Sequence, residues 1–294
     1  MEFRPLHAFT LEQLTSLWNE GFQQYFVNLN FTLDMFLKRS VTEGLSFAHS
    51  FAILDGERPI GFVMNGFRQE GGRKIAWNGG TALVPEYRGR FIGKRLMEEA
   101  LRIYRAENVD TALLEAIKEN APAIALYRKY GYEVTDTLAF YQWEGQIGAN
   151  TFGALVGSDR YTFEIGNPQD VQQLTFHEEL QPWQSQWQTL QSGGLAIIAR
   201  EPSGEPAGYA LIKKVLDEHG EHRSTILYQC AAKEDAPVRS ALISALLIRA
   251  YASSQSIVCR TGNLPLSQHV VVEQLEQAGF KKTLEQVHMR LELR

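Results

Sequence analysis

The chain has 294 residues, enough for two domains of about 150 residues, and its 44% hydrophobic and 11% aromatic residues can fill two cores. Its 29 Lys and Arg residues against 34 Asp and Glu give a net charge of -5, which excludes a general binder of nucleic acid or of anionic membranes. No run approaches the ~18 apolar residues that cross a bilayer, and residues 1–7 lack the basic and apolar pattern of a secretory leader. We therefore expect a cytoplasmic protein with no membrane or nucleic-acid partner.

The cysteines and histidines argue against a metal site. Cys230 and Cys259 are the two cysteines, and both lie in apolar, strand-like segments, so a disulfide framework and a four-cysteine metal site are excluded. His219 and His222 are close in sequence, but the segment resembles a hairpin turn and offers no third ligand nearby. The sequence therefore predicts structural thiols and no bound metal.

The first half of the chain alternates between helical and strand-like patterns. In chain order the predicted elements are aromatic-rich helical segments over 18–37, a strand-turn-strand over 51–64, a strand over 74–84, an amphipathic helix over 93–107, a strand around 113–115, a helix after Asn120 and a strand over 132–143. Leu96, Met97, Ala100, Leu101 and Tyr104 share one face of the helix over 93–107. That helix is expected to pack on a sheet through this single apolar stripe.

The second half is a weak repeat of the first at a shift of 148 residues. The shift carries Gly56 onto Gly204, Gly131 onto Gly279, and the helix over 93–107 onto the apolar stretch 241–255. This pattern predicts the α/β class (an α+β mixed sheet), with two tandem domains that each hold a central twisted mixed sheet flanked by helices. The polar, glycine-containing segment 144–150 separates them and gives domain ranges of 1–146 and 150–294.

The turn between the strand over 74–84 and the helix over 93–107 is the clearest candidate binding site. It combines backbone N–H groups at the positive end of a helix with glycines that allow close approach, an arrangement that binds phosphate. Four cations, Arg88, Arg90, Lys94 and Arg95, lie within eight residues of an otherwise acidic chain. Dinucleotide-binding and P-loop motifs are both absent from the sequence.

This turn and a second motif resemble the GNAT superfamily of acyl-CoA-dependent N-acyltransferases. The family signature Arg/Gln-x-x-Gly-x-Gly/Ala matches residues 88–93 except at Phe91, where the family usually has glycine. The signature Asn-x-x-Ala-x-x-Leu-Tyr-x-x-x-Gly-Phe/Tyr is met in full over 120–132. Phe91 can still offer its N–H to a phosphate, but only with its side chain turned away and with a φ that is negative or strained.

The resemblance implies that the first domain binds acetyl-CoA and that particular residues contact it. The pantetheine would lie against a splayed strand and the pyrophosphate on the amides of the following turn. The implied contact residues are Ala82, Leu83, Val84, Arg88, Gly89, Arg90, Phe91, Ile92, Gly93, Lys94, Asn120 and Tyr127. The resemblance also implies that Tyr127 protonates the departing thiolate, because a phenol with a pKa near ~10 is protonated at neutral pH.

The group that accepts the proton of the attacking amine has two candidates. Glu115 stands at the spacing at which some family members carry a glutamate, twelve residues before Tyr127, and a water chain is the alternative. The strand over 74–84 contains no Asp or Glu, which excludes a base from that strand. The resemblance assigns the aromatic segment 18–37 to the acceptor pocket, whereas the residues alone are equally typical of a helix core.

The second half lacks this chemistry, so we expect a degenerate GNAT-like domain there. At the shift of 148 the phosphate-binding turn becomes residues 236–241, with no glycine and a proline, while Tyr127 falls on Leu275 and Asn120 on Gln268. This domain would cover the first one and close its acceptor pocket. Trp183 and Trp187, which one helix would place on the same face, are candidates for that intramolecular contact.

The function implied is a GNAT-type N-acetyltransferase, in which an amine attacks the thioester of acetyl-CoA directly. The acceptor, a small-molecule or peptide amine, stays open, because the family scaffold serves many acceptors through its loops. Acyl chains longer than acetyl also stay open. The alternative is a non-catalytic acyl-CoA-binding sensor module, an interpretation that Phe91 keeps in play.

Overall fold

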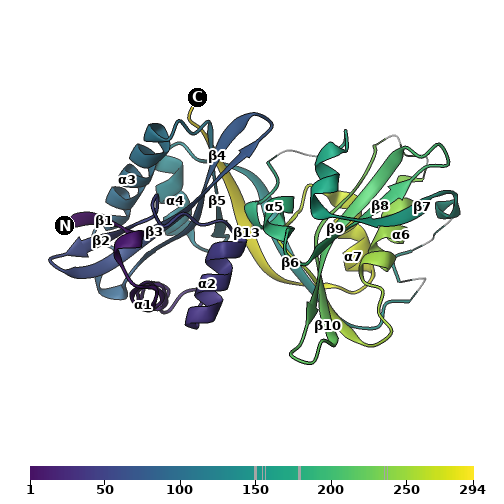
Figure 1. Cartoon of the computed structure of the whole chain (residues 1–294), viewed down its shortest axis with the longest axis horizontal. Helices are drawn as coiled ribbons and strands as arrows, with labels where there is room; N and C mark the ends of the chain where they lie inside the picture. Colours follow the sequence, from purple (N-terminus) through teal and green to yellow (C-terminus); the bar gives the residue numbers. More distant parts are fainter. Residues whose placement is uncertain (149–150, 154, 156, 178–179, 235, 237) are drawn as a thin grey trace. The chain divides into compact units, whose positions relative to one another are not determined.

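A computed structural model describes residues 1–294 except 149–150, 154, 156, 178–179, 235 and 237 (Figure 1). The described chain divides into two compact units. Unit 1 comprises Met1–Thr135 together with Val287–Arg294, and unit 2 comprises Asp136–Gln286.

Unit 1 is a sheet with helices on both faces. Its elements are β1 (Glu2–Pro5), α1 (Leu11–Gly21), α2 (Leu33–Thr42), β2 (Phe51–Asp55), β3 (Arg58–Glu70), β4 (Arg73–Leu83), α3 (Ile92–Ala106), β5 (Thr111–Ile117), α4 (Ala121–Lys129) and the end of β13 (Lys281–Glu292). The strand order is β1-β2-β3-β4-β5-β13. The pairs from β1 to β4 are antiparallel, and β4 pairs with β5 in parallel.

Alternate residues of β3 show which helices cover which face of the sheet. Phe62 packs against Trp18 of α1, with ring centroids 5.6 Å apart. Asn65 points the other way and accepts a hydrogen bond at 2.6 Å from the hydroxyl of Tyr104 on α3. Because neighbouring strand residues face opposite sides of a sheet, α1 and α3 lie on opposite faces.

The parallel pair β4–β5 opens partway along its length. The pairing register runs from Ile75↔Thr111 to Asn78↔Leu114 and ends there. However, β4 continues to Leu83 and β5 to Ile117. The two strands therefore diverge beyond this last pair, and the gap between them begins beside Glu115.

The C-terminal strand β13 completes the core of unit 1. Val287 and Met289 are buried in the same hydrophobic cluster as α3 and α4, and the N–H of Leu293 donates to the carbonyl of Asp110 at 2.8 Å. Val287–Arg294 thus belong to the first compact unit, although the sequence-derived range 150–294 places them in the second domain. The assignment of 1–146 as catalytic and 150–294 as degenerate stays a prediction.

Unit 2 holds the remaining strands of the mixed sheet, which pack against the apolar helix α6. Its elements are β6 (Glu133–Gly145), β7 (Thr162–Gly166), α5 (Trp187–Leu190), β8 (Gly194–Arg200), β9 (Pro206–Leu216), β10 (His222–Ala232), α6 (Arg239–Ala250), β11 (Ile257–Thr261), β12 (Leu264–Pro265), α7 (His269–Gln277) and the start of β13. The strand order is β6-β11-β10-β9-β8-β7, and β12 also pairs with β6. Cys230 on β10 and Cys259 on β11 are buried free thiols, as expected.

The repeat read from the sequence is visible in the backbone of the two units. Gly56 and Gly204 both turn a hairpin with positive φ, +60° and +89°. Gly131 and Gly279 follow α4 and α7 with φ values of +89° and +87°. These are conformations that glycine adopts at little cost, which explains why the landmarks recur.

The expectation that one helix carries Trp183 and Trp187 is wrong. Trp183 lies in a single 3-10 turn, Trp183–Ser185, and Gln186 is extended with ψ of 148° before α5 begins at Trp187. Trp183 is fully buried and Trp187 packs against a hydrophobic cluster of unit 2. Both indoles therefore have a structural place in their own unit.

Two predicted segments lie partly outside the described residues: residues 149 and 150 of the linker, and Pro237 of the segment that replaces the phosphate-binding turn. The linker was predicted over 144–150, but its first two residues, Glu144 and Gly145, form the end of β6 and pair with β11.

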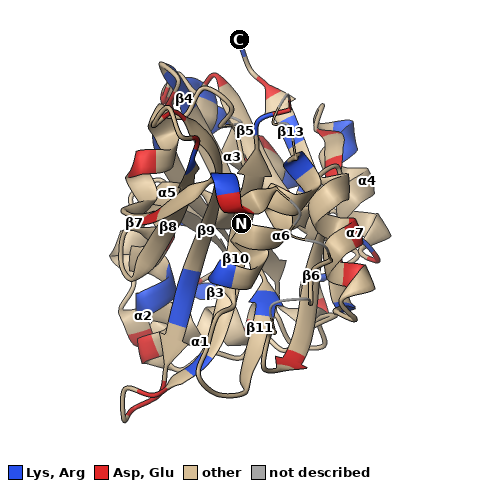
Figure 2. Ribbon diagram, turned by 90° about the vertical axis from the view of Figure 1, so that its right-hand side faces the viewer, with Lys and Arg blue, Asp and Glu red and all other residues tan. Residues whose placement is uncertain are grey.

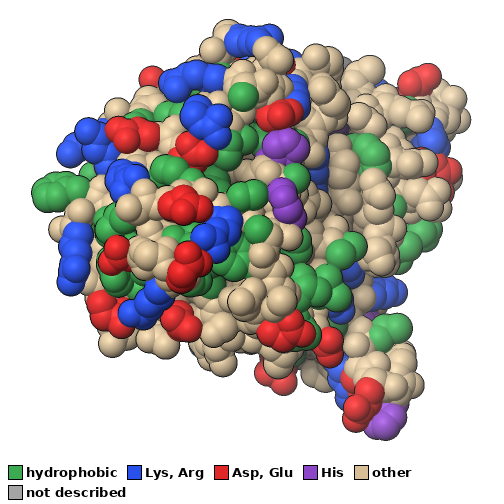
Figure 3. All heavy atoms as spheres, turned by 60° about the vertical axis from the view of Figure 1, so that its left-hand side comes forward, with side chains coloured by type: hydrophobic (Ala, Val, Ile, Leu, Met, Phe, Trp, Pro, Cys, Tyr) green, Lys and Arg blue, Asp and Glu red, His purple; other side chains and the backbone are tan. Residues whose placement is uncertain are grey.

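The surface carries charges of both signs. Blue and red residues are interspersed along the ribbon in Figure 2, and the face in Figure 3 mixes them with hydrophobic side chains. No helix within the described ranges is long and apolar enough to span a bilayer. Nor do three or more His, Cys, Asp or Glu side chains gather into a possible metal site among the described residues.

Candidate active site

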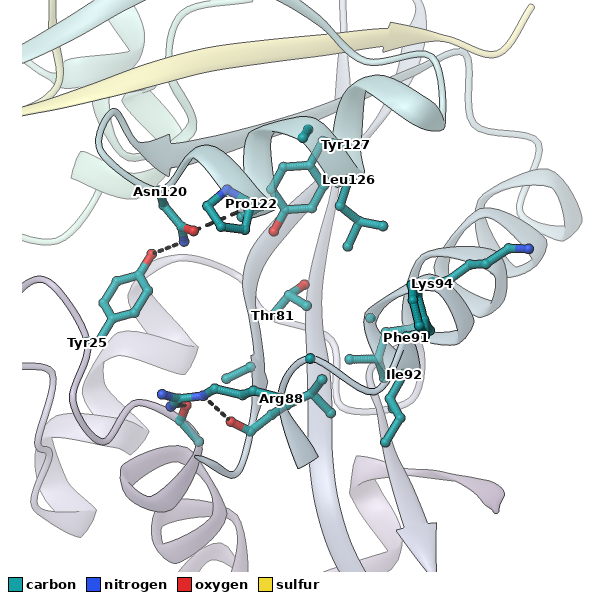
Figure 4. A pocket seen from close by; sticks show the side chains of 18 of the residues that line it. Tyr25, Thr81, Arg88, Phe91, Ile92, Lys94, Asn120, Pro122, Leu126 and Tyr127 are labelled. Carbon is teal, nitrogen blue, oxygen red and sulfur yellow. Dashed lines mark hydrogen bonds between the residues drawn. The ribbon is translucent and has the colours of Figure 1, made fainter. Parts of the chain in front are cut away.

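A pocket of about 940 Å³ opens beside the gap between β4 and β5 in unit 1 (Figure 4). Four segments line it: the chain after α1, the end of β4, the turn and first residues of α3, and α4. These segments include the two sequence motifs, which the fold brings to opposite walls of the same cavity. Most of the predicted site residues should therefore lie on the walls of this pocket.

The turn before α3 presents the backbone of a helix N-terminus to the pocket. Phe91 is the N-cap residue and has a left-handed conformation, with φ of +60°, so the strained alternative expected at this position is the one observed. Its side chain is 88% exposed and makes no cap hydrogen bond. The first turn of α3 contains no acidic residue. The amides of Ile92 and Gly93 are thus available to an anion at the positive end of the helix dipole.

The basic side chains of the turn have different binding partners. The Arg88 guanidinium donates to three carbonyl oxygens, those of Leu83 at 3.0 Å, Gly21 at 2.9 Å and Gln23 at 2.8 Å. It therefore fixes the end of β4 to the chain after α1 (Figure 4).

Lys94 lines the pocket, with its ammonium 3.7 Å from the carboxylate of Glu98. The guanidinium of Arg90 lies 5.2 Å from the ring centroid of Tyr87, and Arg90 is not among the lining residues. Gly89, with φ of +74°, does line the pocket. Of these three cations, Arg88 and Lys94 line the cavity, and the guanidinium of Arg88 is already bound to three carbonyls.

The end of β4 forms the floor of the pocket beside the diverging strands. Thr81, Ala82 and Leu83 line it, whereas Val84 is buried and its N–H donates to the Ile60 carbonyl at 3.0 Å. The Thr81 hydroxyl donates to the side-chain oxygen of Asn78 at 3.0 Å. Unpaired with β5 in this stretch, the strand offers its backbone to a ligand in the gap.

Tyr127 projects from α4 into this pocket opposite Thr81 (Figure 4). Burial raises the pKa of its phenol to about 12, the nearby Tyr25 phenol adds to the rise, and a hydrogen bond with Thr81 opposes it. The phenol is consequently neutral across the physiological range and able to donate a proton.

Asn120 caps α4 and joins it to the chain after α1. Its side-chain oxygen accepts a hydrogen bond at 3.3 Å from the N–H of Ala123, and its amide donates at 3.4 Å to the hydroxyl of Tyr25. Burial raises the pKa of the Tyr25 phenol, with the Asn120 contact opposing the shift. Both residues line the pocket, so the cap also positions one of its walls.

The aromatic segment is divided between the pocket and the core. Phe22, Tyr25 and Phe26 line the pocket. Trp18 is buried and stacks on Phe31, with centroids 5.2 Å apart. The two interpretations of this segment therefore each hold for part of it.

Glu115 stands at the start of the gap between β4 and β5 and is not among the residues that line the pocket. Its side chain is 4% exposed, and its carboxylate accepts a hydrogen bond from the indole N–H of Trp77 at 2.7 Å. Trp77, which donates to Glu115, also lies with its ring centroid 5.9 Å from the guanidinium of Arg39 on α2, so Glu115 faces the side of the sheet that α2 covers.

Sequence reasoning missed other lining residues, including Gly21, Thr81 and Tyr130. The Tyr130 hydroxyl donates to the Lys94 carbonyl at 3.1 Å and ties α4 to α3. A signal was available for Tyr130, which follows Tyr127 by three residues and so shares its helix face.

Comparisons with known proteins agree on one family. Residues 9–132 match the model of the acetyltransferase (GNAT) family. A mycothiol acetyltransferase of Saccharomonospora viridis is 36% identical over 67 residues, which are 23% of this chain and 22% of that protein. The chain thus spans less than a quarter of this curated relative's length.

Solved structures share the fold of both units. The GCN5-related glucosamine N-acetyltransferase region of a fungal multi-domain GH3 β-N-acetylglucosaminidase has a TM-score of 0.67 at 14% identity, covering 95% of this chain and 36% of that chain. A tandem GNAT protein from the clavulanic acid biosynthesis pathway has a TM-score of 0.61 at 16% identity, covering 99% of this chain and 98% of its own. These likenesses confirm the predicted mixed-sheet tandem fold.

Proposed function

Because residues 9–132 match the acetyltransferase (GNAT) family, we propose that the chain transfers an acetyl group from acetyl-CoA to a primary amine. The observation that carries this proposal is the pocket. In it lie a helix N-terminus, the end of β4 that is not paired with β5, and the Tyr127 phenol. These three parts suit a pyrophosphate, a pantetheine chain and a departing thiolate respectively.

In the proposed complex the pyrophosphate of acetyl-CoA binds the amides of residues 88–93, and Lys94 adds positive charge. The pantetheine lies along Ala82 and Leu83 and forms hydrogen bonds with the unpaired backbone there. Val84 and Arg90 act from outside the cavity, by holding the strand end and the turn. Arg88 contributes its backbone to the site, because its guanidinium already binds three carbonyls.

The reaction needs three proton transfers around the diverging strands. Glu115, or a water chain, takes a proton from the incoming ammonium, and the neutral amine attacks the thioester carbonyl carbon. A C–N bond forms, the nitrogen loses its second proton to solvent, the C–S bond breaks, and Tyr127 protonates the departing thiolate. The Tyr127 phenolate is then reprotonated from solvent, so that the amide, free CoA thiol and one proton are the products.

The acceptor class is proposed from the pocket and the relatives. Phe22, Tyr25 and Phe26 give the wall after α1 an apolar surface suited to the carbon skeleton of a small amine. A mycothiol acetyltransferase and a glucosamine N-acetyltransferase region are among the similar proteins, so amino sugars and their conjugates are the first amines to test. Unit 2 is proposed to be a degenerate GNAT domain that binds no acyl-CoA.

Calorimetric titration with acetyl-CoA, followed by thiol release with a panel of amines, tests this proposal. One site per chain together with amine-dependent thiol release is expected. Two sites per chain would contradict a degenerate unit 2. Binding without turnover for any amine would favour the alternative, a non-catalytic acyl-CoA sensor, and absence of binding would refute both.

A further inference from the structure

A histidine from the end of the chain lies beside the carboxylate at the start of the β4–β5 gap. Nε2 of His288, on β13, is 3.9 Å from Oε1 of Glu115, on the neighbouring strand β5. Both side chains are buried, 8% and 4% exposed respectively. On the far side of Glu115, the indole of Trp77 on β4 donates to the carboxylate at 2.7 Å. Three adjacent strands thus contribute to one polar cluster.

The imidazole of His288 is fixed in this orientation by Thr135. The Thr135 hydroxyl lies 3.3 Å from Nδ1 of His288 and 3.3 Å from its carbonyl oxygen. A contact at Nδ1 turns Nε2, the other ring nitrogen, toward Glu115. His288 belongs to the same compact unit as Glu115, although 173 positions separate them in the sequence.

Helix α2 also brings charged groups near this cluster. The guanidinium of Arg39 lies 5.9 Å from the ring centroid of Trp77, donates to the Gly79 carbonyl at 2.6 Å and pairs with Glu43 at 2.9 Å. The charge of Arg39 is therefore balanced by Glu43, whereas the imidazole of His288 lies within 3.9 Å of the Glu115 carboxylate.

We propose that His288 is a positioning residue for acetyl transfer, which holds the Glu115 carboxylate ionised and oriented at the gap between β4 and β5. This inference rests on the proposed function. Its chemical step is the first proton transfer: one N–H bond of the ammonium breaks, its electron pair stays on nitrogen, and the proton binds a Glu115 oxygen. After turnover the proton leaves to solvent, and no other reactant is needed.

The reason lies in the cost of burying a charge. A carboxylate as buried as Glu115 favours its protonated form, in which it cannot act as a base. An imidazolium within about 4 Å offsets that cost and favours the ionised form. Trp77 supplies a hydrogen bond but no charge, so the electrostatic part of the task falls to His288. The proposed site is consequently incomplete without the C-terminal strand.

The pH dependence of kcat/KM in the full-length protein tests this role. His288→Gln keeps an N–H donor near the position of Nε2 and removes the positive charge. We expect the acidic limb of the profile to move up by about one pH unit, with acetyl-CoA affinity unchanged, because an opposite charge at this range lowers a carboxyl pKa by about one to three units.

His49→Gln is the matched control, since His49 forms a similar pair with Glu107 at 3.2 Å in the same unit, away from the pocket. Its acidic limb should stay where the wild-type limb lies. An unmoved limb in His288→Gln, or an equal movement in the control, overturns the inference while leaving the proposed function intact. A wild type that releases no thiol with any amine overturns the proposed function and this inference with it.

A second measurement does not depend on turnover. The His288 ring proton is followed by NMR across the pH range and is assigned by its loss in His288→Gln. Replacing Glu115 by Gln should lower the titration midpoint of His288, because the imidazolium loses its partner. An unchanged midpoint shows that the two groups are not coupled and overturns the inference.

Discussion

The side-chain amide of Asn120 donates a hydrogen bond to the phenol of Tyr25 at 3.4 Å, across 95 residues of sequence. The same asparagine caps α4 by accepting the N–H of Ala123 at 3.3 Å. One side chain thus links the helix that carries Tyr127 to the aromatic segment that forms the facing wall of the pocket. We expect the cap to affect mainly stability and the bond to Tyr25 to affect mainly ligand binding.

Asn120→Ala removes both contacts, and we expect it to lower the free energy of unfolding by about 1 kcal/mol, the usual cost of losing an N-cap. Denaturant unfolding measures this change. Tyr25→Phe removes the phenol alone, so its stability should stay within about 0.5 kcal/mol of wild type while acetyl-CoA binding weakens. If Tyr25→Phe binds acetyl-CoA as wild type does, the wall after α1 is not fixed by this bond.

Phe91→Gly should stabilise the protein. Phe91 holds φ of +60°, a left-handed conformation that costs a residue with a Cβ about 1 kcal/mol and costs glycine little. Thermal unfolding should show a higher Tm, and calorimetry should show acetyl-CoA affinity equal to or tighter than that of wild type.

Phe91→Ala is the control, because alanine keeps the strain while losing the ring. Its Tm should not rise. Weaker acetyl-CoA binding in both variants would instead mean that the exposed ring itself contacts the ligand, contrary to this expectation.

Tyr127→Phe should abolish proton donation to the thiolate. General acid catalysis contributes about 10²- to 10⁴-fold, so kcat should fall by about 100-fold or more while the Kd for acetyl-CoA is unchanged. Rapid-mixing measurement of thiol release, with calorimetry for the Kd, separates the two effects. Equal losses in kcat and affinity would indicate that Tyr127 is a structural residue of the pocket wall.

The raised pKa of Tyr127 also predicts how stability varies in alkali. Burial raises the pKa of this phenol to about 12, whereas an unfolded tyrosine titrates near ~10. The folded protein holds the proton more tightly, so the stabilisation is complete below about pH 10 and is lost as the pH rises toward 12. Unfolding in urea from pH 8 to 11 should show this decline, and it should be shallower in Tyr127→Phe. If stability declines with pH equally steeply in the wild type and in Tyr127→Phe, the Tyr127 phenol is not buried as described.

The two motifs were readable from the sequence because each depends on residues close together in the chain. Residues 88–93 form a turn whose glycines and helix dipole act locally, and Asn120 caps a helix by accepting from the N–H of a residue only three positions away. The fold class followed from alternating patterns and the repeat at 148 residues. Local rules of this kind depend on backbone preferences that neighbouring residues set.

Long-range pairings were not readable in this way. Nothing near Arg88 indicates that its guanidinium binds the carbonyls of Gly21 and Gln23 and not a phosphate. The strand pattern over 280–293 likewise predicts a strand but not its neighbour, because any strand of matching pattern satisfies the same local rules. The pairing of His288 with Glu115 follows from that neighbour and was equally hidden.

The C-terminal strand gives the last prediction, that unit 1 depends on residues 287–294 for its stability. Met289 is fully buried in the core that also holds α3 and α4, so Met289→Ala should lower the free energy of unfolding by about 2 to 5 kcal/mol. Val134→Ala, at a site that is 37% exposed, is the control and should cost less than about 0.5 kcal/mol.

A fragment of residues 1–146 extends the same argument, because it lacks β13 and leaves the edge of β5 and the core around Met289 uncovered. It should unfold at lower denaturant concentration than the full chain and bind acetyl-CoA weakly. Joining residues 281–294 to the fragment through a flexible linker should restore both properties. A fragment that is as stable as the full chain and binds acetyl-CoA equally well would show that residues 1–146 are a complete domain.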